Sequence, residues 1–149
     1  MSVFVDTNVL VYARDLSVPA KQQRAHEWMS ALWASRLGRT SVQVLNEYYV
    51  TVTRKLTPGL APRDARADVD DLRAWMPVPI SAGLLETAFA VEDRFGLSYW
   101  DCLIVAAAQV ADCDYLLTED LQDDQRLDTV TVINPFAHQP DTILVARRR

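Results

Sequence analysis

The chain has 149 residues, of which 50% are hydrophobic and 23% charged, as in one globular domain that we expect to span residues 1–149. It holds no apolar run long enough to cross a membrane and no signal peptide at its start, so we expect a cytoplasmic protein. The net charge of −5 argues against a nucleic-acid partner, but residues 1–60 hold seven Lys/Arg and four Asp/Glu and could present a basic edge.

Short strands and longer helices alternate along the first half of the chain. Val3-Phe4-Val5 is a β-branched and aromatic run typical of a buried strand. Apolar residues then recur at helical spacing over residues 19–35, from Ser41 to about residue 56, and from Pro62 to about residue 75. Residues 39–40 are expected to form a second strand.

The second half continues the alternation. Residues 77–80 can hold only a short strand, because their prolines cannot donate to a ladder. Ser81 and Ser98 are expected to cap helices that end near residues 95 and 111. Strands are predicted at 114–117 and 130–133, and residues 138–149 are expected to be a C-terminal tail. This order predicts an α/β fold with a parallel sheet, whose ligands bind at the C-terminal ends of the strands.

The first candidate site residue, Asp6, directly follows the first strand. Thr7 and Asn8 come next and could hydrogen-bond the turn and a neighbouring carboxylate. The alternative is an ordinary helix N-cap, for which Asp, Thr and Asn are all suited.

Three further acids could reach the same edge. Glu47 lies at the margin of the apolar face of its helix, where a surface glutamate is the alternative. Asp101 lies on a helix so apolar that a charge there needs a partner, although Ser98 and Asp101 also resemble a capping box. Asp120 follows the strand at 114–117, in an acidic loop where Thr118, Glu119, Asp123 and Asp124 compete for the role.

Converging acids require a cation. Two carboxylates about 4 Å apart repel by roughly 4 kcal/mol at an effective dielectric constant of 20. Hard divalent ions prefer oxygen ligands, and Mg²⁺ binds one or two carboxylates together with substrate phosphate. The pattern therefore predicts a Mg²⁺ or Mn²⁺ site for phosphoryl transfer.

These segments closely resemble the PIN-domain ribonuclease family, in particular VapC-type toxins of toxin–antitoxin pairs, over nearly the whole chain. The resemblance is carried by four motifs and a terminal segment, namely 4–12, Glu47, 98–101, 117–122 and 133–136. One departure is Asp124, where the subgroup sharing the Thr-Glu-Asp-Leu-Gln-Asp stretch usually has glycine.

The resemblance implies a three-layer α/β/α fold with a mostly parallel five-stranded sheet, and a metal-dependent endoribonuclease. Asp6, Glu47, Asp101 and Asp120 would be catalytic, with Asp6, Asp101 and Asp120 holding Mg²⁺ or Mn²⁺. Thr7, Asn8 and Thr118 would orient these ligands. The resemblance further implies a homodimer and a small antitoxin partner, which would bury a segment in a groove near the site.

An RNA substrate would approach over positive charge near the acids. The candidate contacts are Arg14, Lys21, Arg24, Arg39, Arg54, Lys55 and the terminal Arg147, Arg148 and Arg149. For most of them a solvated helix face is the alternative. Trp28, Trp33 and Trp75 have helical core spacing, which favours packing in the core or a dimer over base stacking.

Other functions fit less well. Cys102 and Cys113 lie in apolar stretches without a Cys/His cluster, which argues against zinc or a disulfide. His26 and His138 lie outside every motif. An aspartate-nucleophile phosphatase usually has a second Asp where Asn8 stands, and a receiver domain needs a late lysine, whereas no lysine follows Lys55. A non-catalytic RNA- or protein-binding module of the same fold is the remaining alternative.

Overall fold

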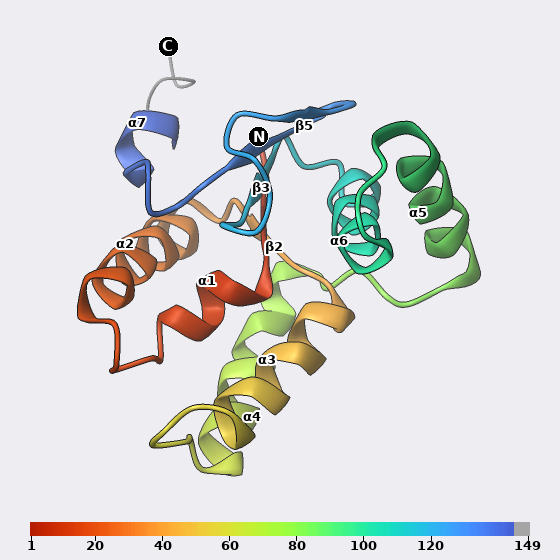
Figure 1. The fold of residues 1–149 in the computed structure, drawn as a ribbon. Coiled ribbons are helices and arrows are strands. Elements are labelled where there is room, and N and C mark those ends of the chain that lie inside the picture. Colours follow the sequence, from red (N-terminus) through yellow and green to blue (C-terminus); the bar gives the residue numbers. More distant parts are fainter. Residues whose placement is uncertain (145–149) are drawn as a thin grey trace.

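A central sheet of five short strands organises the protein (Figure 1), which a computed structural model describes over residues 1–144. The strand order is β2-β1-β3-β5-β4, and all neighbours are parallel except β4 and β5. The strands are β1 (Val3–Val5), β2 (Gly38–Arg39), β3 (Tyr115–Leu117), β4 (Arg126–Leu127) and β5 (Val130–Ile133). The expected α/β fold with a mostly parallel five-stranded sheet is confirmed.

Helices cover the sheet on both sides. In Figure 1, α1, α2 and α7 lie to one side of the strands and the α5–α6 pair to the other, while α3 and α4 lie below the lower ends of the strands. The helices are α1 (Thr7–Tyr12), α2 (Pro19–Ser35), α3 (Val42–Arg54), α4 (Pro62–Leu72), α5 (Ala82–Phe95), α6 (Tyr99–Val110) and α7 (Pro140–Leu144), with a 3-10 turn, η1, at Arg73–Trp75. Among these described helices, none is long and apolar enough to cross a membrane.

The core lies on β1 and α6. All three residues of β1 are fully buried, as expected for a parallel strand covered on both faces. Cys102 to Ala108 are seven consecutive buried residues of α6, so this helix is enclosed on every side along its middle. The elements that end in Asp6 and begin near Asp101 are therefore the most rigidly held in the molecule.

The elements differ from the expectations in three places. Residues 77–80 form no strand; Val78 makes only an isolated bridge with Ser41, since prolines flank it on both sides. The fifth strand is instead β4, which pairs with β5 as a short antiparallel ribbon. The expected tail begins with α7, whose Pro140 and Leu144 are buried, and residues 145–149 lie outside the described part.

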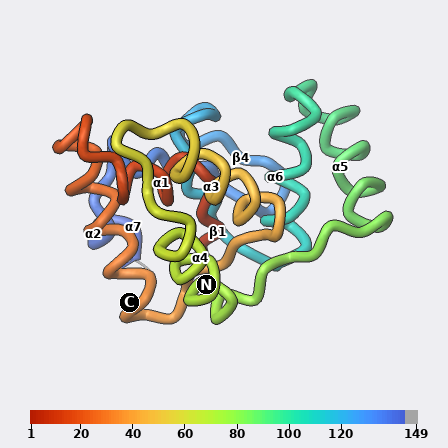
Figure 2. Tube along the Cα trace, turned by 90° about the horizontal axis from the view of Figure 1, so that it is seen from below, coloured from red at the N-terminus to blue at the C-terminus, as the bar shows by residue number. Residues whose placement is uncertain are grey.

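The C-terminal edge of the sheet is where helices from both halves meet. Viewed from below in Figure 2, α1 and α3 lie close to β1, and α6 follows towards the side on which α5 lies. Helix α1 contacts both α2 and α3, while α6 contacts β3 and β5. This edge therefore collects residues from β1, α3, α6 and the segment after β3.

Candidate active site

Asp6 ends β1 and begins α1. Its backbone N–H continues the ladder to the Leu117 carbonyl at 3.1 Å. Its Oδ1 accepts from the Thr7 N–H at 2.7 Å and its Oδ2 from the Thr118 hydroxyl at 2.8 Å. The residue is only 6% exposed. The capping role that competed with a functional one is real, but it uses one oxygen and leaves the other turned towards Thr118.

Burial makes the negative charge of Asp6 unfavourable. Loss of water raises the pKa of its carboxyl from 3.8 to about 7, while the hydrogen bonds from Thr118 and Thr7 partly oppose this. The charges of Asp120 and Glu47 raise the pKa further. Of the three other predicted acids, Asp120 and Glu47 are therefore the two whose charges act on Asp6.

Glu47 reaches the site from α3 through Thr7. The Thr7 hydroxyl donates to Glu47 Oε2 at 2.6 Å, and the Gln43 amide donates to Oε1 at 3.0 Å. Gln43 and Glu47 are one helical turn apart, so the helix itself sets this pair. Both oxygens of an otherwise exposed glutamate are thus oriented, in agreement with the expectation that Thr7 positions a neighbouring acid.

Asn8 connects Asp6 to Asp120. Its Nδ2 donates to Asp120 Oδ2 at 3.1 Å and to the Thr118 hydroxyl at 2.9 Å. The Thr118 hydroxyl also accepts from the Asp120 N–H at 3.1 Å. Thr118 is fully buried, and its single hydroxyl joins Asp6, Asn8 and Asp120 in one hydrogen-bond network.

Asp101 lies in the first turn of α6, and its N–H donates to the Ser98 hydroxyl at 3.3 Å. Desolvation raises the pKa of Asp120, the Asn8 hydrogen bond lowers it, and the charges of Glu119, Asp101 and Glu47 raise it again. Asp101 thus acts on Asp120 through its charge, whereas Asp6, Glu47 and Asp120 are joined by hydrogen bonds through Thr7, Asn8 and Thr118.

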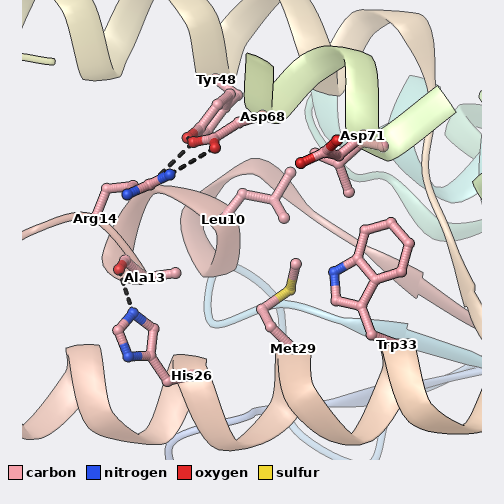
Figure 3. Close-up of a pocket in the computed structure, with 10 residues that line it drawn as sticks. Leu10, Ala13, Arg14, His26, Met29, Trp33, Tyr48, Asp68 and Asp71 are labelled. Atoms are coloured by element: carbon pink, nitrogen blue, oxygen red, sulfur yellow. Dashed lines mark hydrogen bonds and ion pairs between the residues drawn. The ribbon is translucent and has the colours of Figure 1, made fainter. Parts of the chain in front are cut away.

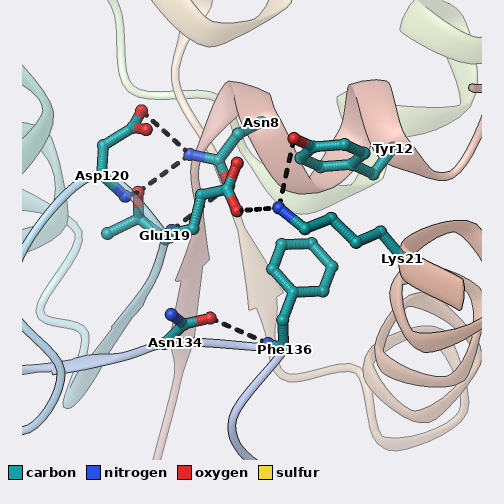
Figure 4. A network of polar contacts seen from close by, with 8 residues as sticks. Asn8, Tyr12, Lys21, Glu119, Asp120, Asn134 and Phe136 are labelled. Atoms are coloured by element: carbon teal, nitrogen blue, oxygen red, sulfur yellow. Dashed lines mark hydrogen bonds and ion pairs between the residues drawn. The ribbon is translucent and has the colours of Figure 1, made fainter. Parts of the chain in front are cut away.

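The competing acids of the 119–124 loop are held elsewhere. Glu119 Oε2 accepts from Lys21 Nζ at 2.7 Å (Figure 4). Asp123 Oδ1 accepts from the Asn134 N–H at 2.8 Å, and its Oδ2 lies 2.7 Å from His138 Nε2. Asp123, Asp124 and His138 offer ligand atoms within 4.8 Å of one another. The sequence analysis missed this grouping because His138 lies outside every motif.

Of the six expected RNA contacts within residues 1–144, four are already occupied, while Arg147, Arg148 and Arg149 lie outside the described residues. Arg14 forms an ion pair with Asp68 at 2.5 Å, Lys21 with Glu119, and Arg24 with Glu27 at 3.3 Å. Arg39 donates to the carbonyls of residues 36 and 38. Within residues 1–144, the side chains of Arg54 and Lys55 are exposed and make no ion pair. These two remain available to an anion.

An open hollow joins Lys55 to the acids. It is lined on one side by α3 and on the other by α1 and the loop after β3, through Thr7, Asn8, Val11, Tyr12, Asp15, Glu47, Thr51, Lys55, Glu119 and Asp120. Glu47, Thr51 and Lys55 follow one another at four-residue spacing along a single face of α3. A phosphate chain lying in the hollow would thus pass from a cation to the carboxylates.

A second, more apolar groove runs between α1, α2 and α4 (Figure 3). Leu10, Met29, Trp33 and Leu72 line its apolar part. At one end, Asp68 accepts from both Arg14 and the Tyr48 hydroxyl. The groove and the hollow beside the acids both border α1 but share no lining residue, since Leu10 lines the groove and Thr7, Asn8 and Val11 line the hollow.

The four acids carry the ligand type that a hard divalent cation binds, although among the described residues only Asp123, Asp124 and His138 bring three ligand atoms within 4.8 Å of one another. All four present carboxylate oxygens, which Mg²⁺ and Mn²⁺ prefer. Burial raises the pKa of the Asp6 carboxyl, so a cation beside it would stabilise the charged form. Asn8 and Thr118 occupy only some of the lone pairs of these carboxylates.

Comparison with known proteins identifies a family. Residues 3–126 match the sequence profile of the PIN domain. No curated protein matches the sequence significantly.

Several solved structures are similar in fold. A toxin–antitoxin complex from Klebsiella pneumoniae is 18% identical with a TM-score of 0.61, covering 93% of this chain and 99% of that one. VapC20 of Mycobacterium tuberculosis, a toxin that cleaves the sarcin–ricin loop, is 21% identical with a TM-score of 0.56, covering 77% and 87%. VapBC2 from Rickettsia felis, bound to a promoter DNA fragment, is 17% identical with a TM-score of 0.57, covering 90% and 98%.

Replacing Asp6 should stabilise the metal-free protein. Between pH 3.8 and about 7 the folded state retains a proton that the unfolded state releases, so stability falls as pH rises and the full penalty applies above pH 7. We expect Asp6→Asn to raise the free energy of unfolding by about 2–4 kcal/mol at pH 8, and by little at pH 3.5. Urea unfolding in EDTA measures this difference.

The matched control is Asp93→Asn, an exposed acid of α5, which should change stability by less than about 0.5 kcal/mol. Equal effects of the two substitutions, or an Asp6→Asn gain that is independent of pH, would contradict the assignment.

Proposed function

Because the chain belongs to the PIN domain family, we propose that it is a divalent-metal-dependent endoribonuclease that hydrolyses RNA phosphodiester bonds. The observation that carries this proposal is the coupling of Asp6 with Asp120 and Glu47 at the C-terminal edge of the sheet. The burial of the Asp6 carboxylate costs stability in the free protein, and such a cost is typical of functional sites.

The proposed roles follow from position. Asp6, Asp101 and Asp120 would hold Mg²⁺ or Mn²⁺, and Glu47 would complete the group directly or through water. The ion would lower the pKa of a bound water and stabilise charge on the reacting phosphate. Thr7 fixes Glu47, while Asn8 and Thr118 keep their donors on the other acids and so orient the ligands.

RNA would enter along the hollow beside α3. Arg54 and Lys55 are the cations that support this direction, since Arg14, Lys21 and Arg24 are paired. Binding by few cations on an acidic protein should depend on salt with a shallow slope. Such a site would act in the cytoplasm, where RNA is abundant.

Asp6→Asn should abolish cleavage while preserving RNA binding. We expect the cleavage rate of total RNA in Mg²⁺ or Mn²⁺ to fall by about 100-fold or more, with no cleavage by the wild type in EDTA. Mapping the cut ends would also identify the target. Asp123→Asn should retain cleavage, because Asp123 is held by Asn134 and His138.

The reverse result, an active Asp6→Asn and an inactive Asp123→Asn, would place the chemistry at the other acidic group. Absence of cleavage in every metal, with RNA binding intact, would favour the alternative of a non-catalytic binding module.

We further propose that the protein is the toxin of a toxin–antitoxin pair. The similar Klebsiella pneumoniae structure is a toxin–antitoxin complex, and the groove in Figure 3 offers an apolar surface between α1, α2 and α4 for a partner segment. A segment of a small antitoxin would lie there with apolar residues against Leu10, Met29 and Trp33. At one end of the groove, Tyr48, Arg14 and Asp68 would hydrogen-bond the polar groups of this segment.

Met29→Glu should weaken binding of a small protein encoded next to this gene by about 30-fold or more, because it buries a charge in the groove. Calorimetry with the purified pair measures this. Leu16→Glu, at an exposed site outside the groove, is the control and should not change affinity. If Leu16→Glu is as damaging, or Met29→Glu is harmless, the groove is not the seat. A gene without such a neighbour would count against the toxin role alone.

The proposed homodimer rests on an exposed aromatic surface. Phe89 is 50% and Trp100 68% exposed, and both rings contact Tyr99 across α5 and α6. Exposed apolar patches of this kind mark interfaces. Trp100→Glu should turn a dimer into a monomer in sedimentation equilibrium, whereas Val110→Glu, also exposed on α6, should not. A dimer that survives Trp100→Glu would exclude this surface.

A further inference from the structure

The ammonium group of Lys21 makes several specific contacts, unlike that of a solvated surface lysine. Its Nζ donates to Glu119 Oε2 at 2.7 Å and to the Tyr12 hydroxyl at 3.3 Å. It also lies 4.6 Å from the centre of the Tyr12 ring and 4.8 Å from that of Phe136. Figure 4 shows the ammonium between the two rings, with Glu119 in front of it. The Lys21 ammonium thus points towards the Glu119 carboxylate.

The two aromatic rings that flank the Lys21 ammonium, those of Tyr12 and Phe136, are themselves held in place. The rings of Tyr12 and Phe136 meet edge to face at 5.2 Å. The Phe136 N–H donates to Asn134 Oδ1 at 2.9 Å, and the preceding Pro135 carbonyl accepts from the buried Trp28 indole at 3.1 Å. Three separate parts of the chain, α1, α2 and the segment after β5, therefore combine to hold one ammonium group.

Glu119 needs this partner because it stands next to Asp120 in the site. The side chain of Glu119 is only 22% exposed, so its charge is partly removed from water and is balanced by Lys21. The Glu119 N–H donates to Asn8 Oδ1 at 3.4 Å, while Asn8 Nδ2 binds Asp120. The same amide thus holds both residues of the turn, one through its oxygen and one through its nitrogen. A shift of the Glu119 side chain would reach Asp120 through Asn8.

We propose that Lys21 is a positioning residue of the active site. Its ammonium, held between the Tyr12 and Phe136 rings, fixes the Glu119 carboxylate so that Asp120, and not Glu119, is turned towards Asp6. The proposal rests on the nuclease function proposed above. Lys21 makes no contact with the four acids; it acts by neutralising the adjacent Glu119 and fixing the 118–120 turn. The sequence offered Lys21 as an RNA contact, and this geometry reassigns it.

Lys21→Met tests this positioning role, since it keeps the aliphatic stem between the rings and removes the charge. We expect kcat to fall about 10- to 100-fold through misplacement of Asp120, with KM for RNA changed less than about twofold. In a Glu119→Gln background, where no charge needs a partner, the same Lys21→Met substitution should cost much less.

The matched control is Lys55→Met, which removes the free cation of the hollow. It should raise KM and reduce the salt dependence of RNA binding by about one counterion, whereas Lys21→Met should leave that slope unchanged when both are measured in the Asp6→Asn protein. A Lys21→Met variant with raised KM, a shallower salt slope and unchanged kcat would show an RNA contact and overturn the proposal.

A second readout does not depend on activity. In the metal-free protein, Lys21→Met should shift the NMR signals of the Asn8 side-chain amide and the Glu119 and Asp120 backbone amides, while α5 signals stay in place. Unchanged signals at these three groups would overturn the positioning role even if activity fell. If the wild type cleaves no RNA, the nuclease proposal fails, and the NMR comparison still decides the role of Lys21.

Discussion

The burial of one carboxylate determines the arrangement of this protein around its sheet edge. Asp6 must follow β1 directly, because its N–H completes the ladder to β3 and its Oδ1 caps α1. A residue so constrained cannot turn out to solvent, and burial therefore raises the pKa of its carboxyl to about 7. Strand β1 fixes the position of Asp6. Because the Asp6 carboxylate is shielded from water, a cation beside it would stabilise its charge.

Neighbouring polar groups hold Asp120 close to Asp6 and hold other acids of the same loop apart from it. Thr118 and Asn8 keep Asp120 with Asp6, while cations and backbone donors hold the other acids of the same loop. Asp123, for example, is bonded by the Asn134 N–H and paired with His138. Without this division, a run of acids would offer many alternative ligand sets of similar energy. The selection is made by contacts from α1, α2 and the segment after β5, all distant in sequence.

Which residues and elements could be predicted from the sequence depends on whether the contacts that determine them are local or distant in sequence. Asp6 and Asp101 can be predicted from local sequence pattern. A charged residue is unusual both at the end of a buried strand and in a strongly apolar helix. The register of Asp120 could not be predicted, since Lys21, which holds its neighbour, lies 98 residues away. For the same reason β4 was missed. Arg126–Leu127 has no strand pattern of its own and pairs only because β5 lies beside it.

The position of a bound cation tests this account most directly. Crystals grown with Mn²⁺ and measured at its absorption edge would show the ion by anomalous scattering. We predict a peak coordinated by Asp6 together with Asp120 or Asp101, with Mn–O distances of about 2.0–2.3 Å. A peak confined to Asp123, Asp124 and His138, or no peak beside Asp6 under conditions that support RNA cleavage, would contradict the central claim.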